Sequence, residues 1–585
     1  MRTLVRELTT KIGQTVTAKG WVHSRRDHGG LVFVDLRDHT GLVQLVIHPE
    51  QAEAFARANE LRDEFVIAAT GSIAERADEL KNDKIETGGI ELVVESLEVL
   101  NRSDALPIQP FAENQANEEL RLKYRYLDLR RTKMQQRLAE RAKYYKAIRD
   151  YMEEREFVEV ATPVLANSSP EGARDFLVPS RVHEGKFYAL PQAPQQFKQL
   201  LMVGGVSRYY QIATCFRDED PRADRLYGDF YQLDLEMSFV EDGEEVRRTM
   251  EPLVKQLVTE FSGKKLLEED IPRLTYQDAM ERFGSDKPDL RFGMELIELS
   301  DVFADSGFGV FKSAIAGGGA VKAIRVKGAA SLSRSQIDGF TDIAKNEGAG
   351  GLAYLTYENG EARSPIAKFL SDAELSAIRE RTGADDGDAV FFGADDRTVV
   401  NKVLGRLRNE FADHFDLKDP NVVALAWVVD FPFYEWDDKA KKLDFGHNPF
   451  SMPKGGVDTL ESTEDKLSIV ADQYDMVMNG YEICSGAVRN HRPDVMYKAF
   501  GVLGYDEAYV EQKFGAMLSA FKFGAPPHAG CAFGLDRIFM VLVGEDNIRE
   551  VVAFPKNGSG VDVMMNSPSV VDDVQLKELG IKRQS

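Results

Sequence analysis

The sequence predicts an α+β protein of several domains, and three observations support that prediction. The chain has 585 residues, more than one ordinary domain holds, so several compact units with separate cores are expected. Short alternating stretches separated by turn residues fill residues 1 to about 105, whereas apolar and basic residues recur at helical spacing from 121 to about 156. Residues 205–240 and 420–550 alternate apolar runs with glycine turns, which is typical of a large antiparallel sheet.

The N-terminal part contains five strand-like stretches: VTAKGWVHS, LVFVDLRD, GLVQLVIH, EFVIAATGSIA and IELVVESLEVL. One helix-like stretch, EQAEAFARANEL, lies between the third and the fourth, and this order predicts an OB-fold barrel. Such barrels bind oligonucleotides by stacking bases on aromatic side chains while cations hold the backbone. Phe33 and Trp21 with Arg25 and Arg26 suit that use. Both rings could instead fill the barrel core, and for Trp21 we expect the core.

A basic segment follows the linker SDALPIQPFAENQANEE. Residues 121–150 hold eleven Lys or Arg against three Asp or Glu, although the whole chain has a net charge of −23. A phosphate-binding surface and a solvated helix face both explain this reversal, and charge alone does not decide between them.

Residues 285–415 differ in texture from the sequence on either side. Glycine clusters (AGGGAVKAIRVKGAA and NEGAGGLAYLTYENGEA) stand there without a recognisable set of catalytic side chains. We interpret this stretch as an inserted domain.

Location and cysteine chemistry are bounded by simple patterns. No run of about 18 apolar residues exists and the N-terminus lacks the apolar core of a secretory signal, so we expect a cytoplasmic protein without a membrane partner. Cys215, Cys484 and Cys531 are far apart in sequence and form no CxxC pair. They are expected to be small buried side chains rather than disulfides or zinc ligands.

Three separated segments carry the chemistry. They are FVEVATPVL (157–165), CFRDED (215–220) with DFYQLDLEMSF (229–239), and GCAFGLDRIFMVL (530–542). The second predicts two antiparallel strands joined by a charged loop, and the third a strand that delivers Arg537 into the start of an apolar helix. Arg217 and Arg537 stand in apolar surroundings, where an unpaired guanidinium is costly without a ligand or a carboxylate.

These segments resemble motifs 1, 2 and 3 of the class II aminoacyl-tRNA synthetases, subclass IIb. Further peptides, namely PEGARDF (170–176), QQFKQLLM (195–202), NGYEICSGAVR (479–489) and PPHAGCAFGLDR (526–537), resemble the bacterial aspartyl enzymes of this class over essentially the whole chain. The class I signatures HIGH and KMSKS are absent, as is a GxxxxGK[ST] phosphate loop.

The resemblance implies an order of domains. It places an anticodon-binding OB-fold at 1–105, a linker at 106–135, the catalytic domain at 136–284 and 416–562, and a C-terminal extension at 563–585. The catalytic domain is expected to be an antiparallel sheet flanked by helices, with an inserted α+β domain of the GAD type at 285–415. Because motif 1 builds a two-fold interface in this class, a homodimer is expected.

The implied reaction converts L-aspartate and ATP to aspartyl-adenylate and pyrophosphate, and then transfers aspartate to the 3′ end of tRNA-Asp with release of AMP. Positioning and charge neutralisation are the main tasks of such a site. Arg217 is implied at the α-phosphate, Arg537 at the γ-phosphate, and Phe230 and Glu219 at the adenine. Oxygen ligands suit Mg²⁺, which the resemblance assigns to Asp475 and Glu482. The remaining implied ATP contacts are Asp218, Gly534, Leu535 and Asp536.

For aspartate itself, the resemblance assigns the side-chain carboxylate to Lys198 and Arg489, because an arginine can bind a carboxylate bidentately and an amide cannot satisfy it. The resemblance assigns the α-ammonium of aspartate to Glu171, Gln195 and Asp234. It also implies that Arg217 contacts the amino acid and that His447 belongs to a mobile loop that closes over it.

The chain departs from the family pattern at a few positions. Asn448 replaces a second histidine, Ala193 replaces a common serine, and the motif 2 loop PRADRLYGDF is one residue longer and lacks QPEF. These departures leave the residues assigned to phosphate and carboxylate unchanged.

In the barrel, Arg26, Phe33, Gln44 and Glu91 match positions that bind anticodon bases. His28 stands where relaxed enzymes of this family carry histidine and strict ones often carry leucine. Two interpretations stay open, an exposed histidine without a role and an enzyme that also charges tRNA-Asn.

Two other functions remain to be weighed. A synthetase for asparagine is disfavoured by Lys198. A binding protein that lost catalysis is disfavoured by five intact residues: Arg217, Glu219, Asp475, Glu482 and Arg537.

Overall fold

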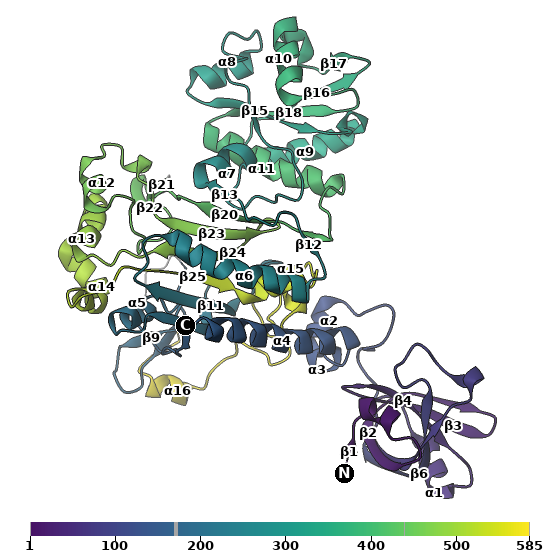
Figure 1. Ribbon diagram of the computed structural model, residues 1–585. Helices are drawn as coiled ribbons and strands as arrows, with labels where there is room; N and C mark the ends of the chain where they lie inside the picture. Colours follow the sequence, from purple (N-terminus) through teal and green to yellow (C-terminus); the bar gives the residue numbers. More distant parts are fainter. Residues whose placement is uncertain (1, 169–172, 438, 584–585) are drawn as a thin grey trace. The chain divides into compact units, whose positions relative to one another are not determined.

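The computed structural model describes residues 2–168, 173–437 and 439–583. The chain forms two compact units, Met1–Gln135 and Gln136–Ser585. Figure 1 shows the helices and strands of each unit. No helix of the described residues is both long enough and apolar enough to cross a bilayer.

The first unit contains the predicted OB-fold barrel. Its sheet has the order β1-β2-β3-β4-β6-β5, and an additional β2–β5 pairing closes it. The elements are β1 (Arg2–Thr3), β2 (Thr15–His28), β3 (Leu31–Asp38), β4 (Gly41–Ile47), α1 (Ala52–Glu60), β5 (Val66–Glu75) and β6 (Ile90–Asn101). The helix lies between the third and fourth long strands, as predicted.

Alternation along the strands builds the barrel core. Val32, Val34 and Leu36 of β3 are all buried inside it, because successive side chains of a strand point to opposite faces. At Gly71 a Cβ would lie 1.9 Å from the carbonyl oxygen of Val93, so only glycine allows β5 and β6 to approach there.

Trp21 does not fill the barrel core, so that expectation was wrong. The indole is only partly buried, and the guanidinium groups of Arg130 and Arg37 lie 5.4 and 5.9 Å from its ring centroid. Small β-branched and leucine side chains fill the interior instead, and the large ring lies against cations outside it.

The basic segment forms α2 (Glu118–Lys123), α3 (Arg125–Asp128) and the long α4 (Thr132–Glu154). Much of its charge is used internally. Arg125, Arg131 and Arg121 lie 2.6, 3.1 and 3.6 Å from the fully buried carboxylate of Asp128. For these arginines neither of the two interpretations of the charge holds, because they stabilise the fold around one carboxylate.

The second unit is built on an eight-stranded sheet with the order β13-β20-β23-β24-β25-β11-β10-β7. All neighbours pair antiparallel except β13–β20 and β10–β7. The strands are β7 (Val158–Glu159), β10 (Arg208–Arg217), β11 (Gly228–Ser238), β13 (Arg273–Thr275), β20 (Leu425–Val429), β23 (Gln473–Met478), β24 (Tyr481–Val488) and β25 (His528–Gly534).

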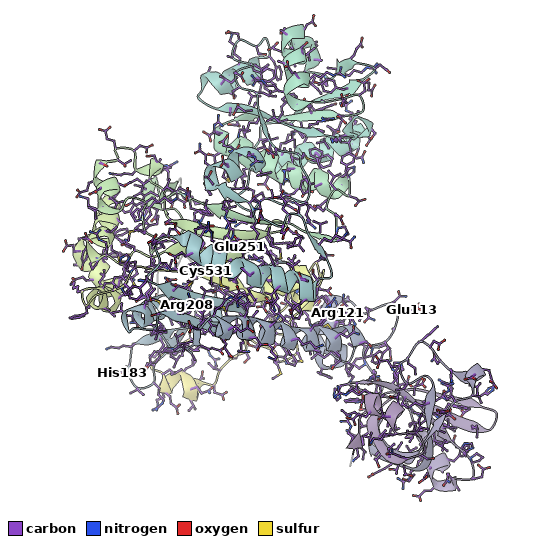
Figure 2. All side chains as sticks on the ribbon, viewed as in Figure 1. Glu113, Arg121, His183, Arg208, Glu251 and Cys531 are labelled. Atoms are coloured by element: carbon purple, nitrogen blue, oxygen red, sulfur yellow. The ribbon has the colours of Figure 1, made fainter. Side chains whose placement is uncertain are left out.

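Helices cover one face of this sheet and form the largest core. Side chains of α4, α6 (Gly243–Phe261) and α15 (Leu535–Leu542) pack there against Leu233 and Leu235 of β11. Cys484 and Cys531 lie in the same core, and all three cysteines are buried and free, as expected (Figure 2, where Cys531 is labelled). The opposite face of the sheet is left for the site described below.

The inserted stretch forms its own sheet, with the order β14-β15-β18-β16-β17. Helices α9 and α11 pack on one face and α8 and α10 on the other. The bounds are β14 (Ile297–Glu298), α8 (Gly309–Ala316), β15 (Ala320–Val326), α9 (Arg334–Asn346), β16 (Ala353–Glu358), β17 (Glu361–Arg363), α10 (Asp372–Thr382), β18 (Ala389–Asp395) and α11 (Arg397–His414). Helix α7 (Tyr276–Phe283) precedes it.

Smaller elements complete the second unit. They are β8 (Leu177–Pro179), β9 (Phe187–Ala189), α5 (Gln195–Val203), β12 (Lys265–Leu266), β19 (Val422–Val423), β21 (Tyr434–Asp437), β22 (Lys442–Phe445), α12 (Gly456–Ser462), α13 (Pro493–Val502), α14 (Glu507–Phe521) and α16 (Asp573–Glu578). The domain borders inferred from the sequence stay predictions.

Candidate active site

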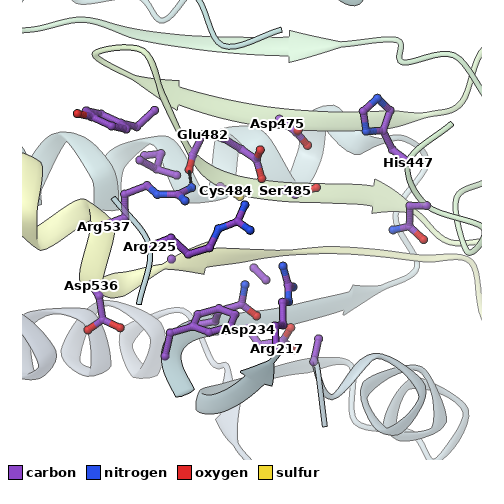
Figure 3. A pocket seen from close by; sticks show the side chains of 18 of the residues that line it. Arg217, Arg225, Asp234, His447, Asp475, Glu482, Cys484, Ser485, Asp536 and Arg537 are labelled. Atoms are coloured by element: carbon purple, nitrogen blue, oxygen red, sulfur yellow. Dashed lines mark hydrogen bonds between the residues drawn. The ribbon is translucent and has the colours of Figure 1, made fainter. Parts of the chain in front are cut away.

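A cavity of about 420 Å³ opens on the face of the eight-stranded sheet that the helices leave uncovered. Its walls come from β10, β11, β23, β24, β25 and α5 and from the segments around 222–226, 286–287 and 447–450 (Figure 3). Thirteen residues singled out from the sequence line it: Gln195, Lys198, Arg217, Glu219, Phe230, Asp234, His447, Asp475, Glu482, Arg489, Gly534, Asp536 and Arg537.

Two other predicted residues do not line this cavity. Asp218 and Leu535 are not among its lining residues, and Leu535 is 1% exposed in the core at the start of α15. Asp218 instead accepts a hydrogen bond from the Tyr227 hydroxyl at 3.1 Å. Glu171 lies outside the described residues. The roles inferred for all three stay predictions.

Strand alternation places charge in the cavity. Leu233 and Leu235 point into the helix-covered core, so Asp234 and Glu236 of the same strand point to the other face. Both carboxylates are fully buried. A buried carboxylate needs a cation or hydrogen-bond donors to compensate for lost hydration, and two cations supply that here.

Lys198 and Arg489 lie between these carboxylates. The Lys198 Nζ is 2.9 Å from Asp234 Oδ2 and 3.3 Å from Glu236 Oε2. Arg489 donates from Nε and Nη2 to the two oxygens of Glu236 at 2.9 and 3.2 Å, which leaves Nη1 outside this pairing. Lys198 and Arg489 are 1% and 2% exposed, so the four groups form a desolvated cluster at one end of the cavity.

The pKa values of the two carboxylates in this cluster are shifted in opposite directions. Burial raises the pKa of Asp234, and Lys198 only partly opposes it. Burial also disfavours ionised Glu236, but Arg489 and Lys198 outweigh it and lower the pKa of that carboxyl. Asp234 Oδ1 and Gln195 Nε2 are buried without a hydrogen bond among the described residues. An acceptor and a donor are therefore available beside the cluster for a polar ligand.

Arg217 ends β10, and its guanidinium carbon lies 5.2 Å from the centroid of the Phe230 ring on β11. Its Nε is buried and has no hydrogen-bond partner among the described residues. Arg537 enters from the first turn of α15 and donates from Nη1 to the backbone oxygen of Glu482 at 2.5 Å. Two guanidinium groups and one aromatic face thus line the same cavity.

Two carboxylates flank the turn between β23 and β24. Asn479 and Gly480 form this turn with φ of 51° and 83°, which brings Asp475 and Glu482 onto neighbouring strands. Burial and the charge of Glu482 raise the pKa of Asp475 well above its usual range. Burial also opposes ionisation of Glu482, but Lys287 and Arg537 lower its pKa. Oδ1 of Asp475 has no hydrogen-bond partner among the described residues.

This pair fits a hard divalent cation in part. An unpartnered buried carboxylate oxygen beside a second carboxylate is the type of donor set that Mg²⁺ takes together with phosphate and water oxygens. Within the described ranges, no group of three or more His, Cys, Asp or Glu side chains is arranged to hold a metal ion. Most ligands of a bound cation would therefore have to come from the nucleotide and water.

The structure adds residues that the sequence analysis missed. Glu236 binds both cations of the cluster, and the alternation of LDLEM, with acids two residues apart on an apolar strand, could have indicated it. Lys287 donates to Glu482 at 2.9 Å, and Arg225 binds Glu219. No local pattern marks Lys287, because its partner is 195 residues away.

The positions that depart from the family pattern lie at the cavity as well. Ala193 and Asn448 line it, and Asn448 Oδ1 accepts from the backbone N–H of Phe450 at 2.9 Å, which fixes the turn after His447. The His447 ring packs near Phe431 and Tyr276, and burial lowers its pKa. In the motif 2 loop, Arg222 and Arg225 exchange backbone hydrogen bonds and so form a tight turn.

In the first unit, the four predicted anticodon residues lie next to one another on the barrel: three are linked by hydrogen bonds and the fourth, Phe33, packs against Arg26. Arg26 donates to Gln44 at 2.6 Å, Gln44 donates to Glu91 at 3.0 Å, and the Arg26 guanidinium lies 5.8 Å from the Phe33 ring centroid. His28 is exposed at the end of β2, beside the turn Gly29–Gly30.

Comparison with known proteins agrees with this geometry. The profile of the family "tRNA synthetases class II (D, K and N)" matches residues 117–558, and that of the "OB-fold nucleic acid binding domain" matches residues 16–100. The chain belongs to the class II tRNA synthetases of the D, K and N group.

Within that family, the chain is similar to proteins named "Aspartate--tRNA(Asp/Asn) ligase". One, from Chlorobium chlorochromatii (strain CaD3), is 51% identical over 97% of this chain and 94% of its own length. Another, from Rickettsia canadensis (strain McKiel), is 49% identical over 97% and 95%.

Solved structures agree on the fold. The asparaginyl-tRNA synthetase from Pyrococcus horikoshii complexed with asparaginyl-adenylate has a TM-score of 0.56 at 20% identity over 95% of this chain and 98% of its own. The aspartyl tRNA synthetase from Entamoeba histolytica has a TM-score of 0.57 at 20% identity over 95% and 92%.

Proposed function

We propose that this chain is an aspartate–tRNA ligase, which activates L-aspartate with ATP and transfers it to transfer RNA. The buried Lys198–Arg489 pair on the acidic residues of β11 carries the proposal, since it is a cationic end of the cavity suited to a second carboxylate. The names of relatives about half identical over nearly the whole chain support it.

In the proposed first step, an α-carboxylate oxygen of aspartate attacks the α-phosphorus of ATP. The bond from that phosphorus to the bridging oxygen breaks, and pyrophosphate leaves with the electron pair. Arg217 stabilises charge on the α-phosphate, and its buried Nε, which has no hydrogen-bond partner within the described part of the chain, supports that contact. Phe230 offers a face for the adenine, and Arg537 holds the far phosphates. In this scheme no side chain acts as a nucleophile.

We propose Mg²⁺ at Asp475 and Glu482. A bound Mg²⁺ would neutralise phosphate charge. Asp475 Oδ1, which is buried and has no hydrogen-bond partner in the described ranges, supports this site. Lys287, which already binds Glu482, must then share that carboxylate.

Aspartate is favoured over asparagine on grounds of charge. An asparagine side chain would present an NH₂ group to those donors of Lys198 and Arg489 that the carboxylates of β11 do not use, and these donors would lack an acceptor in a desolvated place. A protein without catalysis is also disfavoured, because thirteen of the residues assigned to ATP, cation and amino acid line one cavity.

We further propose a homodimer in the cytoplasm. β7 is an edge strand of the large sheet, and apolar side chains near it in sequence are exposed: Val158 52%, Val164 48%, Leu165 52%, Leu177 59% and Phe187 47%. Unpaired edges and apolar patches of this kind favour association with a second copy. Light scattering on the purified protein would test it, and a monomer at micromolar concentration would contradict it.

The tRNA partner is proposed to be tRNA-Asp, with tRNA-Asn as a second acceptor. The Arg26–Gln44–Glu91 line with Phe33 offers hydrogen bonds and a stacking face for anticodon bases. The exposed His28 supports the second acceptor, as do the relatives' names.

Charging of the two purified tRNAs tests both parts. The wild type should aspartylate both, and His28→Leu should lose charging of tRNA-Asn while it keeps tRNA-Asp. Failure of the wild type to charge tRNA-Asp would overturn the proposed function. Charging of tRNA-Asp alone would overturn only the second acceptor.

A further inference from the structure

Lys287 reaches the cavity from a segment that joins α7 to the inserted sheet. Helix α7 ends at Phe283, and its C-cap Gly284, with a φ of 65°, turns the chain into residues 285–294. The ammonium of Lys287 then lies 2.9 Å from Glu482 Oε2 and 3.4 Å from Asp286 Oδ2. Its side chain is 42% exposed, so it can reach a ligand as well as Glu482.

Two cations thus hold Glu482 from different directions. Lys287 binds its carboxylate, and Arg537 binds its backbone oxygen. Both line the cavity together with Asp475. A triphosphate carries several negative charges, so a flexible ammonium close to Glu482 and Arg537 is suited to it beside the arginines that line the cavity.

The segment that carries Lys287 is held by an arginine of the inserted part. Arg408 of α11 is 1% exposed, and its Nη2 donates to the backbone oxygens of Asp289, Phe292 and Gly293 at 2.7, 3.0 and 3.0 Å. Its Nε donates to Met294 O at 3.2 Å. The guanidinium also lies 4.2 Å from the Phe292 ring centroid, so this one side chain fixes most of the segment's second half.

Close packing leaves this segment little freedom on either side. A Cβ at Gly284 would lie 2.1 Å from the Asn401 oxygen of α11, and one at Gly405 of α11 would lie 2.4 Å from the Gly284 oxygen. On the other side, a Cβ at Gly480, in the turn between Asp475 and Glu482, would meet Asp289 Cβ at 3.3 Å. The segment is therefore packed between the inserted helix α11 and the turn that carries the acidic pair.

We propose that Lys287 is a nucleotide-binding residue that contacts the polyphosphate of ATP, and that the inserted part keeps it in place through the positioning residue Arg408. The proposal rests on the proposed function for the identity of the nucleotide. It gives the inserted part a role in the adenylate-forming site.

The experiment measures equilibrium binding of a non-hydrolysable ATP analogue with MgCl₂ by calorimetry, and KM for ATP and for aspartate by pyrophosphate exchange. Lys287→Ala should weaken binding of the analogue and raise KM for ATP by about tenfold, the value of one charge-assisted contact, with KM for aspartate within about twofold. Lys287→Arg should restore part of the loss. Lys402→Ala, which removes an exposed lysine paired with Glu347 on the surface of α11, is the matched control and should change neither.

For Arg408→Met, KM for ATP should rise about three- to tenfold, with no further rise in the double variant with Lys287→Ala, because both act through one contact. Arg406→Met, on the same helix in an exposed pair with Glu410, is the control. Unchanged analogue binding in Lys287→Ala would overturn the role of Lys287, and additive effects would overturn that of Arg408. A wild type that binds the analogue but exchanges no pyrophosphate with aspartate contradicts the proposed function instead, and the binding comparison still decides the role of Lys287.

Discussion

Replacing Lys198 by methionine removes the ammonium at the centre of the charged cluster while it keeps the length of the side chain. In the wild type this ammonium lies 2.9 Å from Asp234 and 3.3 Å from Glu236, and it is 1% exposed. The substitution leaves two buried carboxylates with Arg489 as their nearest remaining cation. Breaking a buried pair in this way costs about 3–5 kcal/mol of stability.

The effect on substrate is worked from the same geometry. Loss of one charge-assisted hydrogen bond to the aspartate carboxylate costs about 1.5–3 kcal/mol, which corresponds to a rise of about 10- to 150-fold in KM for aspartate. KM for ATP should stay within about threefold, because Lys198 pairs with Asp234 and Glu236 and neither of these is assigned to ATP. Pyrophosphate exchange with each substrate varied in turn measures both values.

A matched control separates this effect from general damage. Lys498→Met removes an exposed lysine that pairs with Glu461 at 3.0 Å in the same unit, and it should change neither KM nor the melting temperature. The reasoning is refuted if Lys198→Met raises KM for aspartate less than about threefold, or if KM for ATP rises by the same factor.

Three other substitutions have defined outcomes. Arg217→Ala should lower kcat of exchange by about 10²–10³, with little change in melting temperature because its Nε makes no hydrogen bond to any residue that the structure describes. A loss below about tenfold would contradict this. Asp475→Asn should raise the melting temperature in the absence of nucleotide, because burial and Glu482 oppose ionisation of this carboxyl and raise its pKa. The same substitution should abolish pyrophosphate exchange at any magnesium concentration, and retained activity would argue against the cation site. Burial lowers the pKa of His528 to about 4, so on acidification this side chain is protonated in the unfolded chain before it is protonated in the folded protein. The free energy of unfolding therefore falls as the pH drops from about 6.5 to 4. In urea unfolding, His528→Asn should remove about 3 kcal/mol of that fall, and a pH profile identical to that of the wild type would refute this.

Local patterns predicted much of the fold. Alternation and turn residues gave the strand order of the barrel, and the charged loop and the glycine-marked strand predicted the β10–β11 pair and the entry of Arg537 into α15. The prediction for Trp21 was wrong because the alternation of side chains along a strand does not reveal how wide a barrel interior is. The internal use of the arginines around Asp128 was also out of reach, since a buried acceptor cannot be recognised from charge counts.

In the candidate site too, residues within local motifs were predictable from the sequence and residues with distant partners were not. Residues within recognisable peptides, such as Lys198, Arg217 and Arg489, lie together at one cavity. Glu236 was accessible in principle from its place two residues after Asp234 on an apolar strand. Lys287 was not, because its partner comes from a hairpin 195 residues further along the chain and only the packing of α11 brings the two together. Long-range partners of this kind require the tertiary structure.

The account centres on aspartate as the amino acid that the cavity activates. Pyrophosphate exchange with purified protein, ATP and magnesium, run separately with aspartate, asparagine and lysine, tests it most directly. We predict exchange with aspartate and none above background with asparagine or lysine, because Lys198 and Arg489 require a second carboxylate. Exchange with asparagine at a comparable rate, or with none of the three, would contradict the account.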